Sequence, residues 1–349
     1  KKFAPASKGS GVSQIMGFLK HKPVPMNLKV GLIKLISGII AIGSGFPLGP
    51  EGPSVQMGGS VAWQMAKWLR APVAFRRVIV AAGGGAGIAA VFSAPLGGFV
   101  YAIEELLNSA RPVILLLVII TTFIADSSAI FLQGGINEPI YKIDFLFSRF
   151  DFIYLILLGA IIGMIAELYS KYILMMQNLG KKLYENKFVL KMSICGFILG
   201  SIYSILGDEF HNLDNLKKMI ATQNGIDIRL AILTVFVLFI TSGLAAASGA
   251  PGGLFYPMLI LGGAIGLIVG SCSLIPYEAL STYIFAGMGA FVAGCSRTPI
   301  TAMFLAFALT KNLLIMKPVL ITCITSFLVA RIFNEESIYE RQIQIELDE

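Results

Sequence analysis

Hydrophobic residues in this chain are gathered into long stretches that carry no charge, and short polar connections separate the stretches. The charge-free runs include residues 78–103, 192–207 and 230–277. A helix needs about 20 apolar residues to cross a bilayer, so the longest run must hold more than one segment. The pattern therefore predicts an all-α protein that crosses a membrane several times. We expect a short helix that begins near residue 10, a broken helix that starts at residue 50, and helical segments near residues 28–44, 75–92, 95–107, 113–132, 150–176, 189–206, 229–246, 253–270, 280–293, 298–310, 317–332 and 337–346, with polar connections at 134–150 and 207–228.

A weak internal repeat relates two parts of the chain at a constant offset of 204 residues. The segment SGFPLG at 44–49 returns as SGAPGG at 248–253, and further Pro and Gly positions match at the same spacing out to Pro95 and Pro299. Many transporters consist of two such halves, each with a broken helix, and bind substrate near the membrane midplane where the halves meet. We therefore predict two halves, residues 1–150 and 151–349, that form one membrane domain without a soluble regulatory domain.

The repeat also has a consequence for the start of the chain. The segments at 152–166 and 192–206 precede the second copy, and their counterparts would lie mostly before residue 1. We therefore expect the chain to be a fragment of a longer protein, lacking about two to three N-terminal helices.

Glu51 is a lone carboxylate inside a membrane segment, surrounded by Gly and Pro residues. No other charge occurs between Lys34 and Lys67. The Gly/Pro cluster at 43–53 indicates that the backbone is broken here and that a helix restarts at residues 50–53. A helix N-terminus at this depth offers free N–H donors and a partial positive charge, which suit an anion. A carboxylate can occupy such a site and leave when protonated, so the segment predicts a proton-sensitive anion pathway. The alternative is an acid that only complements the helix dipole.

Composition supports the membrane prediction and narrows the chemistry. Hydrophobic residues make up 56% of the chain and charged residues 13%, whereas soluble domains have about 25% charged residues. The formal net charge is +7, but many cations lie in short connections, as in loops at a membrane surface and not as in a protein that binds nucleic acid. The chain has 2 His and 4 scattered Cys, so we expect neither a metal site nor another cofactor.

Four short motifs, in this order, resemble those of the CLC chloride channels and chloride/proton antiporters. They are GSGVS at 9–13, GPEGP at 49–53, GLFYP at 253–257 and the late Tyr339, which are similar to the family's GSGIP, G(K/R)EGP, GxFxP and tyrosine. The resemblance covers essentially the whole chain, from the family's fourth helix onward. It implies a CLC-type fold in which broken, re-entrant helices of two repeated halves meet at a midplane anion site. It also implies a homodimer with one pore per subunit, embedded in the lipid bilayer of a bacterial inner or plasma membrane.

The resemblance further implies roles for individual residues. Glu51 would be the outer gate that competes with chloride, and Glu105 would be the inner proton acceptor that marks antiporters. Hydroxyl and amide donors bind an anion without a full positive charge, so the ion can leave again. The anion-binding residues implied are Ser10, Tyr339, Leu254, Phe255, Gly49 and Gly52.

The predicted function is therefore exchange of chloride for protons, not an enzymatic reaction. A passive chloride channel of the same fold is the nearest alternative, and Glu105 argues against it because channel relatives usually carry Val there. A fluoride/proton exchanger is a second alternative. It is suggested by two departures from the family's motifs, since Pro50 replaces the usual Lys or Arg and Ser13 replaces the usual Pro. Ser10, in contrast, favours chloride. Pro50 lacks both a cation and an N–H donor, which should weaken an outer anion site. An intramembrane hydrolase with paired acids is a distant alternative, because the sequence has no HExxH motif.

Each candidate also has a plain structural interpretation. Ser10 could be a helix N-cap, Tyr339 an interfacial anchor and Phe255 a core side chain. Glu104 and Glu105 follow a long uncharged run, so one or both could extend from a helix end to the membrane surface.

Overall fold

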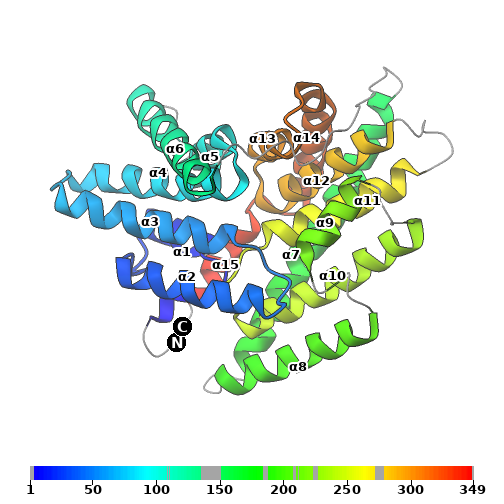
Figure 1. Ribbon diagram of the computed structural model, residues 1–349, viewed down its shortest axis with the longest axis horizontal. Helices are drawn as coiled ribbons and strands as arrows, with labels where there is room; N and C mark the ends of the chain where they lie inside the picture. The colour runs from blue at the N-terminus through cyan, green and yellow to red at the C-terminus, as the bar shows by residue number, and fades with distance from the viewer. Residues whose placement is uncertain are drawn as a thin grey trace.

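The computed structural model describes residues 4–107, 109, 111–134, 151–183, 188–206, 210, 212–222, 227–271 and 279–347. Helices form nearly all the regular structure of these residues (Figure 1). The first part of the chain contains η1 (Pro5–Ser7), α1 (Val12–Leu19), α2 (Leu28–Gly43), α3 (Glu51–Trp68), α4 (Val73–Phe92), α5 (Pro95–Tyr101), the π-helical η2 (Ala102–Leu107) and α6 (Pro112–Leu132). The second contains α7 (Asp151–Leu183), α8 (Phe188–Leu206), α9 (Leu213–Thr222), α10 (Ile228–Ser248), α11 (Phe255–Gly270), α12 (Leu280–Ser296), α13 (Pro299–Thr310), η5 (Leu313–Ile315), α14 (Met316–Phe333) and α15 (Ile338–Leu347).

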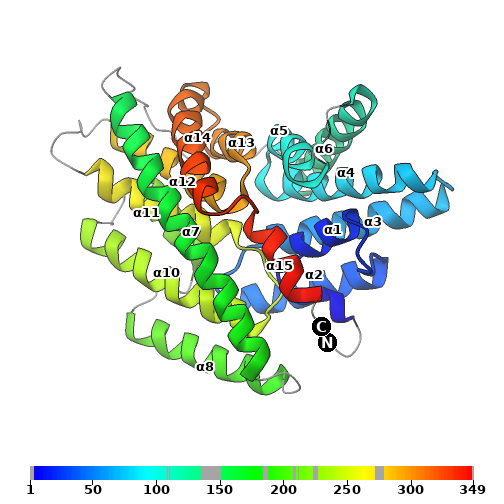
Figure 2. The same cartoon turned by 180° about the vertical axis from the view of Figure 1, so that it is seen from behind.

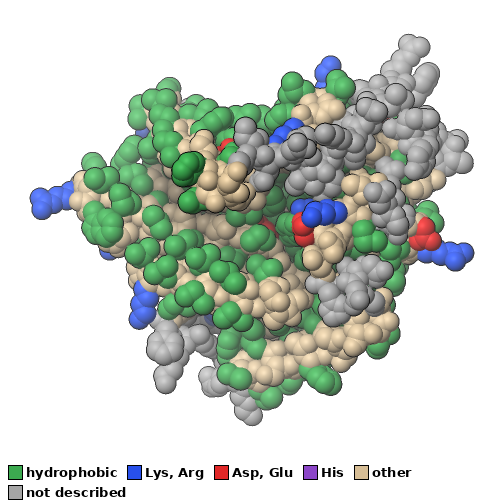
Figure 3. Space-filling view, in the orientation of Figure 1, with side chains coloured by type: hydrophobic (Ala, Val, Ile, Leu, Met, Phe, Trp, Pro, Cys, Tyr) green, Lys and Arg blue, Asp and Glu red, His purple; other side chains and the backbone are tan. Residues whose placement is uncertain are grey.

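The predicted all-α, multi-pass architecture is confirmed. In the part of the chain that the structure describes, 6 helical stretches are long and apolar enough to cross a membrane. Their outward faces carry large apolar side chains such as Phe131, Phe197 and Ile332, which are 84%, 78% and 80% exposed. Hydrophobic side chains cover much of the face seen in Figure 3, where Lys and Arg lie mostly at the edges. Such a surface is stable in lipid, which does not penalise exposed apolar groups.

One predicted connection is wrong, because residues 213–222 form helix α9 within the stretch 207–228 that we expected to be irregular. The helix is amphipathic: Leu216 and Ile220 are fully buried, while Asp214 and Lys218 remain partly exposed. Its mean hydropathy is too low to mark a membrane segment, so the helix is recognisable only by its periodicity. The other expected connection, 134–150, lies outside the described residues from 135 onward, and so does the predicted boundary between the halves.

The two halves use the same close helix contacts at equivalent positions. Helix α3 begins at residue 51 and α11 at residue 255, and α5 and α13 both begin at a proline of the repeat. A Cβ atom on Gly58 would collide with the carbonyl oxygen of Gly83, and one on Gly262 would collide with that of Gly287. Each pair therefore needs glycine for α3 to lie against α4 and for α11 to lie against α12.

Residues from both halves meet where the broken helices begin. The backbones of Gly49 and Gly253 form an antiparallel bridge, with N–H to O distances of 2.9 and 2.8 Å. This bridge directs the N-termini of α3 and α11 toward a common point. Helix α15, the last helix of the chain, packs against α1 and α7 on the side seen in Figure 2 and brings Tyr339 toward the same point.

Candidate functional site

The Glu51 carboxylate lies on the N-terminus of α11. Its Oε1 accepts hydrogen bonds from the backbone N–H of Phe255 at 2.7 Å and from that of Tyr256 at 3.3 Å. The side chain is fully buried. Leu254, which the resemblance paired with Phe255 as an anion ligand, is the N-cap residue of α11. The carboxylate thus binds the free N–H donors of a helix start, as a small anion would.

Two glycines make room for this carboxylate. A Cβ on Gly49 would overlap Glu51 Oε2, and a Cβ on Gly253 would overlap Oε1. Both glycines belong to the bridge between the broken helices, so the bridge also forms the walls of the carboxylate site. Gly52 allows a different contact, between the start of α3 and the segment 9–13. A Cβ on Gly52 would overlap the carbonyl oxygen of Ser10 and prevent this contact.

Three buried oxygen atoms near the helix starts have no hydrogen-bond partner among the described residues. They are Glu51 Oε2 and the hydroxyls of Tyr101 and Tyr339. The Phe255 ring packs against both tyrosines, with ring centroids 6.0 Å from Tyr101 and 5.9 Å from Tyr339. Buried polar groups are normally paired, and an unpaired group costs about 1–3 kcal/mol. Unpaired oxygens near a helix start are expected where a polar or ionic ligand binds, so these three are candidates for contact with one.

Sequence reasoning missed Tyr101. The residue is fully buried at the end of α5, directly before η2. The signal that could have found it is its position, one helical turn before Glu105 and on the same run of helix. No motif of the resemblance includes it.

Ser10 is buried directly before α1. Its Oγ accepts a hydrogen bond from Val12 N at 3.2 Å, so it supports the turn that leads into α1, but the N-cap residue of α1 is Gly11 and not Ser10. The buried ammonium of Lys34 supports this turn by donating to the carbonyl of Gly9 at 2.5 Å. Gly9 and Gly11 flank Ser10 with positive φ angles of 70° and 97°. Lys34 is a second residue that the sequence did not identify as part of the site.

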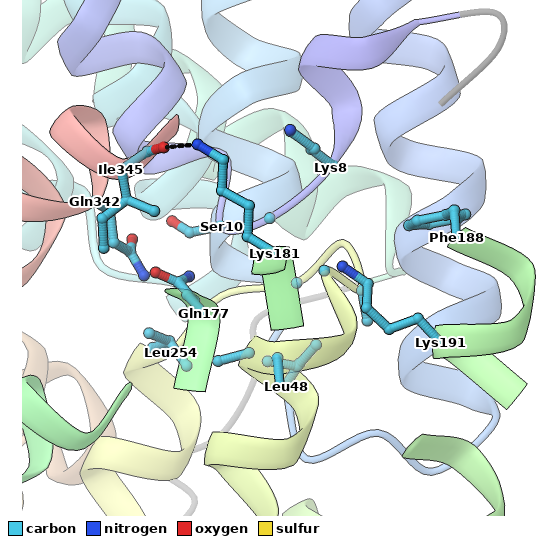
Figure 4. Close-up of a pocket in the computed structure, with 16 residues that line it drawn as sticks. Lys8, Ser10, Leu48, Gln177, Lys181, Phe188, Lys191, Leu254, Gln342 and Ile345 are labelled. Carbon is cyan, nitrogen blue, oxygen red and sulfur yellow. Dashed lines mark hydrogen bonds between the residues drawn. The ribbon is translucent and has the colours of Figure 1, made fainter. Parts of the chain in front are cut away.

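A cavity of about 90 Å³ leads to Ser10 and Leu254 (Figure 4). Lys8, Lys181 and Lys191 line it, and the described residues of its lining include no Asp or Glu. Lys181 also donates a hydrogen bond to the carbonyl of Ile345 at 3.0 Å, which ties α7 to α15. The cavity is therefore electropositive and favours anions over cations.

The adjacent acids Glu104 and Glu105 have different environments. Glu104 caps α13, accepting hydrogen bonds from the backbone N–H of Ile300 at 3.2 Å and from Thr301 N and Oγ1 at 2.8 and 2.7 Å. Glu105 is buried in η2, and it accepts a hydrogen bond from the hydroxyl of Ser337 at 3.2 Å. Glu104 therefore stabilises a helix start, whereas Glu105 contacts the segment before α15 and caps no helix through the hydrogen bond described. Single π-helical turns of this kind often occur at functional sites.

A buried ion triad holds α15, and with it Tyr339. Glu167 of α7 accepts from Arg297 at 2.8 Å and from Arg341 at 2.9 and 3.1 Å. Glu167 is 2% exposed. Because a buried ion is tolerated only when it is paired, these contacts define where α15 must lie.

The chain is similar to known chloride transport proteins in both sequence and structure. The family described as voltage gated chloride channel matches residues 1–331 of the chain. The H(+)/Cl(-) exchange transporter ClcA of Citrobacter koseri is 30% identical over 351 residues, covering 97% of this chain and 74% of that protein. The crystal structure of a slow cyanobacterial Cl−/H+ antiporter superposes on 100% of this chain and 83% of that one, with a TM-score of 0.89 and 29% identity. A CLC-type fluoride/proton antiporter superposes on 97% of this chain and 82% of its own, with a TM-score of 0.80. Its identity of 18% limits that likeness to the fold.

Proposed function

The chain belongs to the voltage-gated chloride channel family, CLC, and on that premise we propose that it exchanges chloride for protons across a membrane. The observation that carries the proposal is the position of the Glu51 carboxylate on the amides of Phe255 and Tyr256. A negatively charged group that fills an anion site excludes a second anion from it. Transport must therefore alternate between the carboxylate and the transported ion.

Protonation of Glu51 would allow its side chain and chloride to occupy the amides of α11 in turn. A neutral carboxyl group interacts with a helix N-terminus much less favourably than a carboxylate does. When Glu51 takes up a proton, its side chain leaves the amides and chloride takes its place. When chloride leaves, Glu51 returns and gives up the proton. Each anion that passes is thereby linked to a proton on Glu51.

Chloride and protons would approach Glu51 from the inner side by different routes. The cavity lined by lysines offers chloride a path to Ser10 and Leu254. Glu105 lies on η2, buried against Ser337 and apart from the lining of that cavity, and we assign it the role of inner proton acceptor. The hydroxyl of Tyr101, buried and unpaired within the described residues, is suited to pass protons or hold the ion between the two acids.

Chloride is the favoured anion. The relatives with about 30% identity are named as Cl−/H+ exchangers, whereas the fluoride/proton antiporter shares 18% identity and supports the fold alone. Ser10, Tyr339 and the Phe255 amide are neutral donors, from which a weakly hydrated anion can also dissociate. By resemblance we assign the protein a homodimeric assembly with one such pathway in each subunit.

The proposal is tested by the reversal potential of the full-length protein in liposomes. Chloride and pH gradients are varied independently, and an exchanger gives a reversal potential that depends on both. A potential that follows chloride alone identifies a passive channel. Replacement of chloride by fluoride in the same experiment distinguishes a fluoride exchanger, which would carry more current with fluoride than with chloride.

A further inference from the structure

A compact charged cluster lies between α9 and the start of α11. Lys217 Nζ is 3.1 Å from Asp214 Oδ1 and donates to the hydroxyl of Tyr256 at 2.6 Å. The Tyr256 hydroxyl in turn donates to Asp214 Oδ1 at 2.6 Å. Lys217 is 5% exposed, and its ammonium lies 4.4 Å from the centre of the Tyr256 ring. Figure 3 shows basic and acidic side chains together on the surface where Figure 1 places α9.

Tyr256 connects this cluster to the carboxylate site. Its backbone N–H donates to Glu51 Oε1 at 3.3 Å, while its side chain contacts Lys217 and Asp214. Lys217 and Glu51 thus contact the same residue, Lys217 through the side chain of Tyr256 and Glu51 through its backbone N–H. A buried cation acts over a longer distance than an exposed one, because water and salt screen it less.

The chain has no cation at the start of α3, where the family's motif usually carries one. Pro50 occupies that position and offers neither a charge nor an N–H donor. We propose that Lys217 supplies the missing positive charge from α9 and attracts small inorganic anions to the outer end of the pathway. On the proposed anion transport, on which this inference rests, Lys217 determines the affinity for anions at the outer end of the pathway, the end at which Glu51 lies.

Asp214 moderates this charge. Burial alone would raise the pKa of Asp214, but the hydrogen bond from Tyr256 and the charge of Lys217 outweigh it and lower the pKa to about 2. Asp214 therefore stays ionised at every pH above about 4. Its negative charge offsets part of the field of Lys217, so removal of that charge should strengthen anion attraction.

The test varies chloride on one side at a time in planar bilayers that contain the full-length protein. For Lys217→Met we expect the half-saturating chloride concentration on the Glu51 side to rise roughly threefold or more, with a weaker dependence on ionic strength. The value on the Ser10 side should stay unchanged. Lys217→Arg keeps the charge and should resemble the unmodified protein. Lys218→Met is the matched control: it removes the same charge from the same helix, together with an ion pair to Asp214 at 3.0 Å, but its side chain is 53% exposed, so the half-saturating concentration should change little.

Two further variants separate electrostatics from damage to the fold. Asp214→Asn keeps an acceptor for Tyr256 and should lower the half-saturating concentration, opposite in sign to Lys217→Met. Adding Pro50→Arg to Lys217→Met should restore part of the lost affinity. Equal losses in Lys217→Met and Asp214→Asn would indicate a structural cluster and overturn the inference, as would a Lys217→Met protein with unchanged affinity. Absence of any chloride current in the unmodified protein would instead refute the proposed function.

Discussion

Glu51 and Phe255 stand 204 residues apart, at equivalent positions of the two repeats, and the side chain of one accepts a hydrogen bond from the backbone of the other at 2.7 Å. At this position the first repeat contributes an acidic side chain, whereas the second contributes the free backbone N–H groups at the start of α11. Two fully symmetric halves would place either two acids or two sets of free amides at this point. The difference between the copies lets the acid of the first repeat occupy the helix start of the second.

Glu51→Gln should remove the pH dependence of transport. The amide is nearly isosteric with the carboxyl group but carries no charge and cannot be ionised, so it mimics the protonated side chain. We expect chloride flux to continue and proton flux to fall to the background of protein-free liposomes. Simultaneous recording of chloride and proton fluxes measures both. Normal proton-coupled transport by this variant would disprove the gating role of Glu51.

Glu105→Gln should stop proton movement and leave chloride movement intact, because the hydroxyls and amides near Glu51 are untouched. Glu104→Gln is the control, since it changes a neighbouring acid whose contacts are with the start of α13. That control should lower stability by about 1 kcal/mol through weaker capping and keep its proton coupling. The same two-flux measurement applies. Uphill proton transport by Glu105→Gln against a chloride gradient would show that another group accepts protons.

Tyr101→Phe and Tyr339→Phe test the unpaired hydroxyls beside Phe255. Each variant keeps the ring packing and removes one buried oxygen. A hydrogen bond to an ion contributes about 1.5–3 kcal/mol, so loss of a direct ligand should weaken chloride binding by about tenfold or more. Titration calorimetry with chloride gives the affinity. A hydroxyl whose loss leaves affinity unchanged but slows proton flux belongs to the proton route instead, and a hydroxyl whose loss changes neither has no part in transport.

Ser10→Ala examines the first motif in the same way. The Oγ already accepts a hydrogen bond from Val12 N, so its removal affects both the start of α1 and any anion ligand. We expect a stability loss of about 1 kcal/mol from the lost hydrogen bond and, if the hydroxyl also binds chloride, a further loss of affinity of about tenfold. Equal affinity in a destabilised variant would limit the role of Ser10 to the start of α1.

The sequence predicted the helices well and the site in part, for identifiable physical reasons. Charge-free runs locate membrane helices because lipid excludes charge, and the repeat located both broken helices. Helix α9 escaped because it is amphipathic and short. Three residues of the candidate site could not be predicted from the sequence: Tyr101, Lys34 and Lys217. Each is of interest because of the buried groups that it contacts, and hydrophobic periodicity does not reveal contacts between distant segments.

Glu167→Gln should destabilise the fold and misplace α15. The substitution leaves Arg297 and Arg341 buried beside a neutral partner, and breaking a buried ion pair costs about 3–5 kcal/mol. Thermal unfolding in detergent should shift downward, and chloride affinity should fall because Tyr339 depends on α15. Glu335→Gln, on an exposed side chain, controls for loss of one negative charge. An unchanged unfolding temperature would mean that the triad does not hold the helix.

The glycine contacts at 58 and 83, and at 262 and 287, restrict how this protein can move. Helices whose backbones touch have no compressible layer of side chains between them, so sliding or tilting one against the other would force atoms to overlap. We therefore expect α3 with α4, and α11 with α12, each to move as a rigid pair through the transport cycle. Within such a pair the adjustable parts are side chains at the helix ends, such as that of Glu51, which can rotate about its χ bonds while the backbone around it stays fixed.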